Sequence, residues 1–360
     1  MSFNITLQRI GAVREHTNAH SLELIDLEGR DYSIVTMKGL YQPGDVVFYF
    51  PVDSILPEPV IDLMGLRDKL ANGLDEHGVK RANRVKTVKL RGEISQGVMA
   101  KPSDLMPYIL SRLEAGDMVG QDFAYLIGVQ KYEPPVVSSK AGNLVPLPDM
   151  VSKYDIESAQ NAPLVAQVLM DMPVYITEKI EGSHWGVTLD AEDKFTVFQR
   201  NYSVIELEYN GHDWHRVARE GGYEDRLKAI KVLYPHAKRV TMRGEIVGPG
   251  IQGNYYQIKD HRVYIFEVEI DGFPLGAAAF LETLEAIGCK DNVPALAYDM
   301  PLREWLDGKT IKDASSGKSL VNSQLLREGI VIKPMMEQLS DQIGRVILKY
   351  RDPIYLAKEK

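Results

Sequence analysis

A stretch rich in serine, glycine and proline, residues 136–150, divides this sequence into two parts with different patterns. Before it, short apolar runs alternate with glycines and prolines. After it, strand-like runs are mixed with amphipathic helical segments. A segment of this composition is typical of a linker, and a chain of 360 residues is longer than one hydrophobic core usually serves. We therefore predict a domain at residues 1–130, a linker at 131–152 and a second domain at 153–360.

The first part has the pattern of a small β-barrel, because its apolar runs are short and separated by turn residues. The expected strands are Ile5–Leu7, Leu22–Ile25, Tyr32–Val35 and Val46–Pro51. Three segments, His16–Leu22, Gln42–Val47 and Leu90–Gly97, resemble the OB-fold that is appended to tRNA-binding proteins. The resemblance implies a groove for single-stranded or irregular RNA. The alternative is a scaffold barrel that only steadies its neighbour.

A run of basic residues without any acid extends from Lys80 to Arg91. From Arg84 onward, basic residues alternate with apolar or polar ones, so a strand there would present a basic face. Lys86, Lys89 and Arg91 are therefore candidate contacts to RNA phosphates, with a solvated edge strand as the alternative. The net charge of −8 argues against a protein that coats nucleic acid non-specifically.

The second part contains a lysine in an unusual setting. Lys179 lies between Glu178 and Glu181, after the strand-like run Pro173–Ile176 and before Gly182. A strand end followed by glycine can direct such a lysine into a cleft, with the glycine permitting a tight turn. Taken alone, K-x-E-G is a weak signal, and a surface turn is the ordinary interpretation.

Later segments share the same feature, a charged or aromatic residue at a strand end or beside a glycine. These residues are Arg200, Glu245, Phe266, Glu328, Lys333 and Lys349. A guanidinium such as that of Arg200 suits a pair of phosphate oxygens. Lys349 lies on a hydrophobic strand, which is a costly position unless an anion is nearby. Taken by itself, Arg200 could equally be a surface residue, and the anion near Lys349 could be a carboxylate.

In their order and spacing these motifs resemble the covalent nucleotidyltransferases, which include polynucleotide ligases and mRNA capping enzymes. Their K-x-D-G motif matches Lys179–Gly182, with Glu181 in place of the usual aspartate. The last motif has the single lysine Lys349, where many relatives have two. The resemblance implies an α+β domain of antiparallel sheets with flanking helices behind the OB-fold.

The resemblance also implies residue roles. Lys179 would attack the α-phosphorus of ATP, and Lys349 and Arg200 would be the other catalytic residues. Nucleotide contacts would come from Glu178, Lys179, Phe266, Glu328, Lys333 and Lys349, with Phe266 stacking on adenine and Glu178 accepting from its amine. Glu181, Glu245 and Glu328 would hold Mg²⁺ or Mn²⁺, which prefer oxygen ligands.

The OB-like module precedes the transferase motifs, and only Arg351–Lys360 follow the last one. This order resembles a branch of ATP-dependent RNA ligases that join 3′-hydroxyl and 5′-phosphate RNA ends. A DNA ligase or a capping guanylyltransferase is the enzymatic alternative. An RNA-binding protein with an inactive transferase domain is the non-enzymatic one.

The remaining features concern the compartment. The single cysteine, Cys289, cannot form an internal disulfide, which favours a reducing, cytoplasmic location. The sequence has neither an apolar run of membrane-spanning length nor the pattern of a signal peptide. We expect RNA as the partner, no membrane association and no obligate protein partner.

Overall fold

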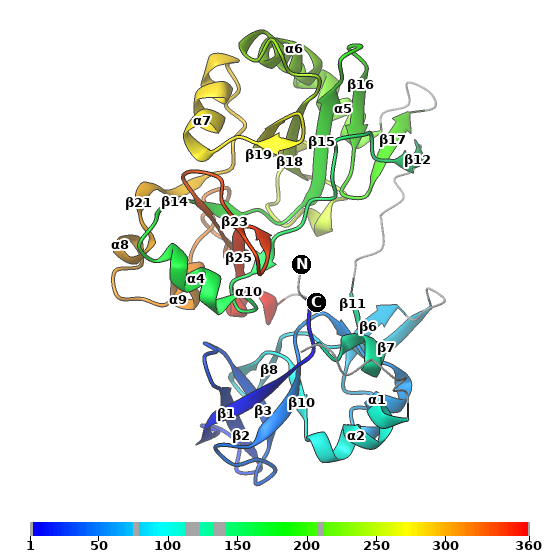
Figure 1. Cartoon of the computed structure of the whole chain (residues 1–360), viewed down its shortest axis with the longest axis vertical. Helices are drawn as coiled ribbons and strands as arrows, with labels where there is room; N and C mark the ends of the chain where they lie inside the picture. Colours follow the sequence, from blue (N-terminus) through cyan, green and yellow to red (C-terminus); the bar gives the residue numbers. More distant parts are fainter. Residues whose placement is uncertain (1–2, 75–78, 112–121, 133–141, 207–211, 359–360) are drawn as a thin grey trace. The chain divides into compact units, whose positions relative to one another are not determined.

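The computed structural model describes the chain except for residues 1–2, 75–78, 112–121, 133–141, 207–211 and 359–360. The chain separates into two compact units (Figure 1). One comprises Ser2–Pro135 with Leu356–Lys360, and the other Val136–Tyr355. No helix in the described part of the chain is long and apolar enough to cross a membrane.

The amino-terminal unit is built on a five-stranded antiparallel sheet with the order β10-β4-β1-β2-β3. Its strands are β1 (Thr6–Glu15), β2 (Leu22–Leu27), β3 (Ser33–Met37), β4 (Val46–Phe50) and β10 (Val98–Ala100). At the β3 edge, the amide of Val35 donates to Oγ of Ser95 at 2.9 Å. The amide of Gln96 donates to the carbonyl of Ser33 at 3.1 Å. These bonds link β3 to the segment that enters β10, so the sheet partly closes into a barrel.

An insertion of residues 51–97 separates β4 from β10. It contains β5 (Ser54–Ile55), α1 (Glu58–Leu63), β6 (Ala71–Leu74), β7 (Lys80–Arg84), β8 (Val88–Leu90) and β9 (Glu93–Ser95). A second sheet has the order β11-β5-β7-β6, where β11 is Gln130–Lys131, and β8 pairs with β9. Helices α1, α2 (Pro102–Leu110) and α3 (Ala124–Ile127) share an apolar core with Phe48 and Phe50.

The prediction of one basic strand from Arg84 to Arg91 is wrong. Strand β7 ends at Arg84, whose guanidinium lies 2.6 Å from Asp53, and β8 begins only at Val88. Between the two strands Val85 and Thr87 are buried. The backbone of Val85 bonds to Ser54 and to Asp53, at 2.8 Å each, so the chain after Arg84 follows residues 53–54 and β8 forms separately with β9.

The carboxy-terminal unit contains a seven-stranded antiparallel sheet with the order β12-β17-β16-β15-β18-β19-β20. Its strands are β12 (Gly142–Pro146), β15 (Ser183–Leu189), β16 (Phe195–Phe198), β17 (Tyr202–Glu206), β18 (Val240–Val247), β19 (Arg262–Ile270) and β20 (Phe273–Pro274). Helices α5 (Asp213–Glu220), α6 (Tyr223–Leu233) and α7 (Ala277–Ala286) cover one face and bury Trp185, Val187 and Met242. The opposite face is left for polar residues.

A five-stranded sheet of the same unit has the order β13-β25-β22-β14-β21. Its strands are β13 (Glu157–Ser158), β14 (Pro173–Lys179), β21 (Ala295–Pro301), β22 (Gly329–Pro334) and β25 (Leu348–Arg351). Helices α4 (Pro163–Leu169), α8 (Leu302–Leu306) and α9 (Ile311–Ser315) pack on Ile176, Ile330 and Ile332. The remaining short elements are η1 (Gln252–Asn254), β23 (Leu339–Ser340), β24 (Gly344–Arg345) and α10 (Pro353–Leu356).

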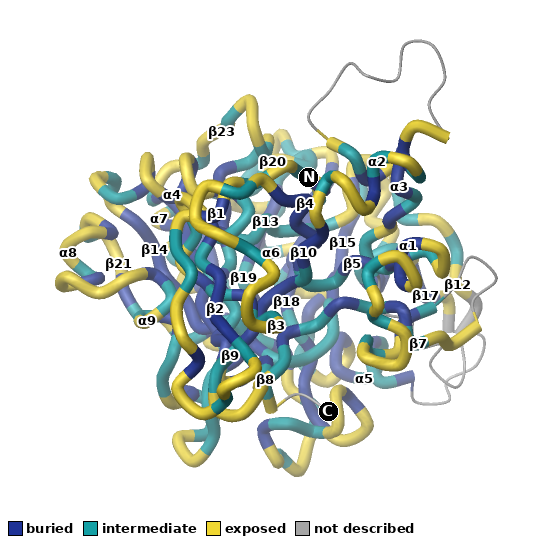
Figure 2. Tube along the Cα trace, turned by 90° about the horizontal axis from the view of Figure 1, so that it is seen from below, coloured by how far each residue is buried: buried dark blue, intermediate teal, exposed yellow. Residues whose placement is uncertain are grey.

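The strands that carry the predicted site residues are buried along most of their length, notably β14 and β18 (Figure 2). A small apolar cluster joins the end of β14 to β18 through Ile180, Val247, Tyr256 and Val293. Such packing fixes the charged residues at the strand ends.

Part of the predicted linker is a strand. Gly142–Pro146 forms β12 and pairs with β17, whereas residues 133–141 lie outside the described residues. Strand β12 has only five residues and lies among glycines and prolines, so the sequence shows no alternation of apolar and polar residues that would predict it. The domain boundaries proposed from the sequence stay a prediction.

Candidate active site

Lys179 is the last residue of β14, and its Cα lies opposite Gly329 on the neighbouring strand β22. This register brings the side chain of Glu328, which immediately precedes β22, beside the lysine. The amine Nζ lies 2.6 Å from Oε1 and 2.7 Å from Oε2 of Glu328. Burial lowers the pKa of Lys179, but the charges of Glu328, Glu245 and Glu181 outweigh it, so the pKa is raised. In this state Lys179 is a cation.

Glu245 approaches the same lysine from the other sheet. It lies on β18 with its Cα opposite His184 on β15. Burial raises the pKa of Glu245 to about 8, against the attraction of Lys179. Two sheets thus direct one cation and two carboxyl groups into a common space.

Gly182 and Gly329, the glycines of two motifs, allow backbone segments to pack closely together. A Cβ at Gly182 would overlap the carbonyl oxygen of Ile246 and crowd the side chain of Glu245. Gly182 therefore lets the segment after Lys179 lie against β18, and its φ is not positive, so the turn expected from the sequence is not its reason. At Gly329 a Cβ would overlap the carbonyl oxygen of Tyr350, which holds β22 close to β25.

Arg200 and Lys349 share an acidic neighbour that sequence reasoning missed. Asp155 Oδ2 lies 2.8 Å from Nη2 of Arg200, and its Oδ1 lies 3.9 Å from Nζ of Lys349. Nε of Arg200 also donates to the carbonyl of Tyr154 at 3.1 Å. Asp155 lies in an irregular segment before α4, where no periodic pattern indicates its role.

The residues predicted to bind the base lie near the same strand ends. Glu178 is buried, and its Oε2 accepts from the amide of Leu320 at 2.6 Å. Its Oε1 has no hydrogen-bond partner among the described residues. Burial raises the pKa of Glu178, opposed by Ser319 and the Leu320 amide. Phe266 is half-buried beside the apolar cluster of Ile180.

Phe266 packs on two rings that the sequence did not single out. Its ring centroid lies 4.9 Å from that of Tyr154 and 5.9 Å from that of His184. Both ring nitrogens of His184 are enclosed and have no hydrogen-bond partner among the described residues. Burial, together with the charges of Arg243 and Arg200, holds the pKa of His184 well below its usual range. Trp185 and Val187 alternate with His184 along β15 and face the core, so His184 lies on the polar face. This alternation in the sequence could have predicted its position.

Lys333 contacts β19, the strand that contains Phe266. Its Nζ donates to the carbonyl of Phe266 at 2.8 Å and lies 3.6 Å from Glu267. Arg345 lies 2.5 Å from the same carboxylate. Burial lowers the pKa of Lys333, although Glu267 opposes the shift. These contacts are with β19 rather than with the carboxylates around Lys179.

The predicted metal ligands are not gathered into one cluster. Within the described ranges, no group of three or more His, Cys, Asp or Glu side chains could hold a metal ion. Glu328 is engaged by the amine of Lys179, while Glu245 and Glu181 act on that amine through their charge. The ammonium group thus attracts the carboxylates that the sequence assigned to a metal.

The basic residues predicted to bind RNA belong to the amino-terminal unit. Lys89 and Arg91 are exposed and Lys86 is half-buried. The side-chain amide of Asn18 donates to the carbonyl of Arg91 at 3.2 Å, which fixes that turn.

Comparisons with known proteins agree with this geometry. A family model described as RNA ligase matches residues 172–351, which include the ends of β14, β18, β22 and β25. The chain belongs to the RNA ligase family. A model described as an OB-fold domain matches residues 4–102 of this ligase. The predictions of an RNA ligase and of an OB-fold preceding the catalytic domain are confirmed, and the alternative of a non-enzymatic protein is not.

Solved structures similar to this RNA ligase cover its whole length. The Naegleria gruberi RNA ligase with PPi is 25% identical, with a TM-score of 0.78 and 99% of each chain covered. A lysine-to-methionine mutant of that ligase with AMP and Mn is 26% identical, with a TM-score of 0.77 and 98% of each chain covered. A glutamate-to-alanine mutant with ATP and Mn is 25% identical, with a TM-score of 0.77 and 99% coverage of each chain. No curated protein sequence matches the chain significantly.

Proposed function

We propose that this RNA ligase uses ATP and Mg²⁺ or Mn²⁺ to join RNA ends that carry a 3′-hydroxyl and a 5′-phosphate. The observation that carries the proposal is the position of Lys179, a half-buried lysine whose amine contacts Glu328 and is attracted by Glu245 and Glu181. The similar Naegleria gruberi ligase was solved with ATP and Mn, which supports the choice of nucleotide and metal.

In the first step the amine of Lys179 attacks the α-phosphorus of ATP. A nitrogen–phosphorus bond forms, the bond to pyrophosphate breaks, and the amine loses its proton. Only the neutral amine is nucleophilic, so the raised pKa of Lys179 has to fall before reaction. Weakening the pair with Glu328 achieves this, because that carboxylate stabilises the ammonium form.

Glu181, Glu245 and Glu328 fit a hard divalent cation by donor type, since all three offer carboxylate oxygens. When bound there, Mg²⁺ or Mn²⁺ would stabilise charge on the phosphate oxygens and favour the neutral amine. Glu328 would then exchange its contact with Lys179 for the cation. Glu245, which is half-buried, would lose its proton, since its pKa is about 8 without a cation.

Glu178 and Phe266 would hold the adenine. The buried Oε1 of Glu178 lacks a partner among the described residues, and the exocyclic amine of adenine supplies a donor. The half-buried ring of Phe266 offers a stacking face backed by Tyr154. Lys333 supports this ring from its backbone side and would contribute indirectly to nucleotide binding.

Two further transfers complete the reaction. AMP passes from Lys179 to the 5′-phosphate of RNA, and the 3′-hydroxyl then attacks that phosphate and releases AMP. Arg200 and Lys349 would bind the phosphates, because Asp155 holds both cations at one place. RNA phosphates would also contact Lys86, Lys89 and Arg91 of the OB-fold unit. Replacing these three together should weaken joining and spare the first step.

The first step is tested with ATP labelled at its α-phosphate in the presence of Mg²⁺ or Mn²⁺. The wild type should keep label after denaturation, Lys179→Ala should keep none, and the exposed Lys194→Ala should behave like the wild type. An adduct on the Lys179→Ala protein, or no wild-type adduct with either metal at any pH, would overturn the proposal.

The substrate is tested with nicked duplexes whose ends are systematically RNA or DNA. Joining should require ribose on the 3′-hydroxyl side, and indifference to that sugar would contradict the choice of RNA ends. A reducing, cytoplasmic compartment completes the proposal, because the single cysteine, Cys289, is buried and forms no disulfide.

A further inference from the structure

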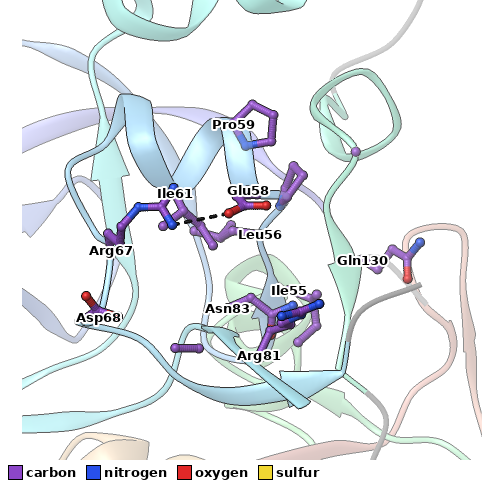
Figure 3. A pocket seen from close by; sticks show the side chains of 13 residues that line it. Ile55, Leu56, Glu58, Pro59, Ile61, Arg67, Asp68, Arg81, Asn83 and Gln130 are labelled. Carbon is purple, nitrogen blue, oxygen red and sulfur yellow. Dashed lines mark hydrogen bonds and ion pairs between the residues drawn. The ribbon is translucent and has the colours of Figure 1, made fainter. Parts of the chain in front are cut away.

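The insertion of the OB-fold unit contains a cavity of about 630 Å³ beside helix α1 and strand β7 (Figure 3). The guanidinium group of Arg67 in its wall is paired within the protein, 2.5 Å from Asp62 and 3.3 Å from Glu58. This charge is thus satisfied by neighbouring side chains. Hydrogen bonds that reach the active site are made instead by residues 248–261, the segment between β18 and β19.

The segment between β18 and β19 has a constrained backbone. Gln252, Asn254 and Gln257 have φ angles of 43°, 52° and 56°, a left-handed conformation that residues other than glycine rarely adopt. Such conformations persist where surrounding contacts enforce them, and they cluster at functional sites. The side-chain amide of Asn254 makes two such contacts: its Nδ2 donates to the carbonyl of Ile258 at 2.9 Å, and its Oδ1 accepts from the Ile258 amide at 3.2 Å. The segment therefore holds its two consecutive tyrosines in fixed positions.

The second of these tyrosines, Tyr256, contacts the nucleophile motif. Its side chain is 1% exposed and packs in one apolar cluster with Ile180 and Val247. Its hydroxyl oxygen accepts a hydrogen bond from the amide of Glu181 at 2.9 Å. The next residue, Gly182, packs so closely against β18 that a Cβ would not fit. The backbone of Glu181 is therefore held on both sides.

The first tyrosine, Tyr255, contacts the segment that leads to Glu328. Its hydroxyl donates to the carbonyl of Leu326, two residues before Glu328, at 2.7 Å. Its ring packs edge-on against that of Tyr256, with 5.3 Å between the centroids. Burial and the charges of Glu181 and Glu328 raise the pKa of Tyr255, so its hydroxyl keeps the proton that it donates. The two tyrosines together tie two separate active-site segments to one constrained segment.

The two segments carry carboxylates that act on the same group. The charges of Glu181 and Glu328 both attract the amine of Lys179, and Glu328 also contacts it. We propose that Tyr255 and Tyr256 are positioning residues for lysyl-AMP formation, which hold the backbones of Leu326 and Glu181 so that both carboxylates stay directed at the nucleophile. This inference rests on the proposed function, because it concerns the first step. A displacement of about 1 Å in such a group can slow a reaction about 100-fold.

The test removes each hydroxyl and leaves the aromatic ring in place, with Tyr256→Phe and Tyr255→Phe. Tyr223→Phe is the matched control, because Tyr223 is 2% exposed and its hydroxyl donates to Asp291 at 3.1 Å, but it belongs to helix α6 and not to the nucleophile motif. Rapid-quench experiments with α-labelled ATP and Mn²⁺ give three quantities: the rate constant at saturating ATP, the half-saturating ATP concentration, and the amount of lysyl-AMP formed per enzyme.

In Tyr256→Phe the rate constant at saturating ATP should fall about tenfold. The half-saturating ATP concentration should stay within about twofold of the wild type, because the lost alignment matters only when Lys179 attacks. The amount of lysyl-AMP should be unchanged. Tyr255→Phe should be slowed by a smaller factor, since its bond lies two residues from Glu328. Tyr223→Phe should keep the wild-type rate constant.

A double-mutant cycle identifies the group through which Tyr256 acts. When Glu181→Gln is already present, adding Tyr256→Phe should slow lysyl-AMP formation less than about twofold, because the carboxylate that the hydrogen bond places is gone. Equal slowing by Tyr256→Phe in the wild-type and Glu181→Gln backgrounds would overturn the assignment to Glu181.

A wild-type rate constant in Tyr256→Phe would overturn the inference. So would a smaller amount of lysyl-AMP formed at an unchanged rate constant, which is the result of a structural role that lowers the folded fraction. If Tyr256→Phe does not fold, Tyr255→Phe decides in the same way. A wild type that forms no lysyl-AMP would overturn the proposed function together with this inference, whereas normal lysyl-AMP formation in the wild type and in both tyrosine variants overturns the inference alone.

Discussion

Both carboxylate oxygens of Glu328 hold the amine of Lys179, at 2.6 and 2.7 Å. The carboxylate therefore has two opposing effects on the nucleophile: it positions the amine, and it raises the pKa of Lys179. If Glu328 acted only as a counter-ion, its removal would lower that pKa and speed lysyl-AMP formation at neutral pH. If it also orients the amine and holds the metal, removal would slow the reaction.

We predict that Glu328→Gln slows lysyl-AMP formation about 100-fold, the usual cost of losing one electrostatic contact in an active site. Rapid-quench measurement with labelled ATP gives the rate. Glu304→Gln, at an exposed position of α8, is the control and should react like the wild type. A Glu328→Gln enzyme that reacts faster at pH 7 would show that the carboxylate is a counter-ion alone.

In the proposed function the adenine contacts Glu178, whose Oε1 lacks a hydrogen-bond partner among the described residues. An acceptor there favours ATP, which carries an exocyclic amine, over inosine triphosphate, which carries a carbonyl at the same place. In Glu178→Gln the amide nitrogen can donate to that carbonyl. The ratio of kcat/KM for ATP over inosine triphosphate should fall at least about tenfold, since a site built for one hydrogen bond rejects the mismatched analogue.

Single-turnover rates with both nucleotides measure this ratio. Glu157→Gln, half-buried on β13, is a control that should leave the ratio unchanged. An unaltered ratio in Glu178→Gln would remove this residue from base recognition.

Strand ends are where the sequence was most informative about which residues lie together. Lys179, Glu245 and Glu328 follow or lie in short alternating runs, and the structure brings them together because β14 and β22 pair with Lys179 opposite Gly329. The sequence predicts that Gly182 permits a tight turn, but in the structure it has another role. Because Gly182 has no side chain, the chain after Lys179 can pack closely against Ile246 of β18. Contacts between residues so far apart in the sequence leave no local pattern from which to predict them.

The parts that were missed depend on tertiary contacts. Asp155 connects Arg200 with Lys349 although it lies in an irregular segment. The basic run after Lys80 has the alternation of one strand, yet it forms two, because β7 pairs with β6 and β8 pairs with β9. Local periodicity is overridden when packing requires a turn. The ion pair between Lys179 and Glu328 also joins residues far apart in the sequence, so no local pattern could predict it.

The polar face of the seven-stranded sheet contains a buried ion pair beneath the site. Arg243 is fully buried, and its Nε and Nη2 lie 2.6 and 3.2 Å from the oxygens of Glu269. Removing one partner leaves a buried charge without compensation, so Arg243→Met should lower the free energy of unfolding by about 3–5 kcal/mol. The double variant Arg243→Met, Glu269→Met should recover most of this loss.

Urea denaturation provides the free energies. Arg303→Met is the control, because its ion pair with Asp171 is exposed on both sides and should contribute less than about 1 kcal/mol. A double variant no more stable than Arg243→Met would mean that packing, and not the unpaired charge, sets the loss.

His184 gives the stability of the protein a defined dependence on pH. Its ring nitrogens are enclosed without partners among the described residues, and burial with the charges of Arg243 and Arg200 holds its pKa well below the usual 6.5. The folded protein therefore keeps this ring neutral where the unfolded chain protonates it. The contribution is fully present above about pH 6.5 and is lost as the pH falls below it.

We predict that the wild type loses about 1.4 kcal/mol more than His184→Gln between pH 7.5 and pH 5.5, since one unit below the unfolded pKa corresponds to that free energy. Denaturant titrations at both pH values measure the difference. His236→Gln, at an exposed histidine, should keep the wild-type dependence. Equal losses in the wild type and in His184→Gln would mean that the folded ring takes up a proton in this range, which requires an acceptor near its nitrogens.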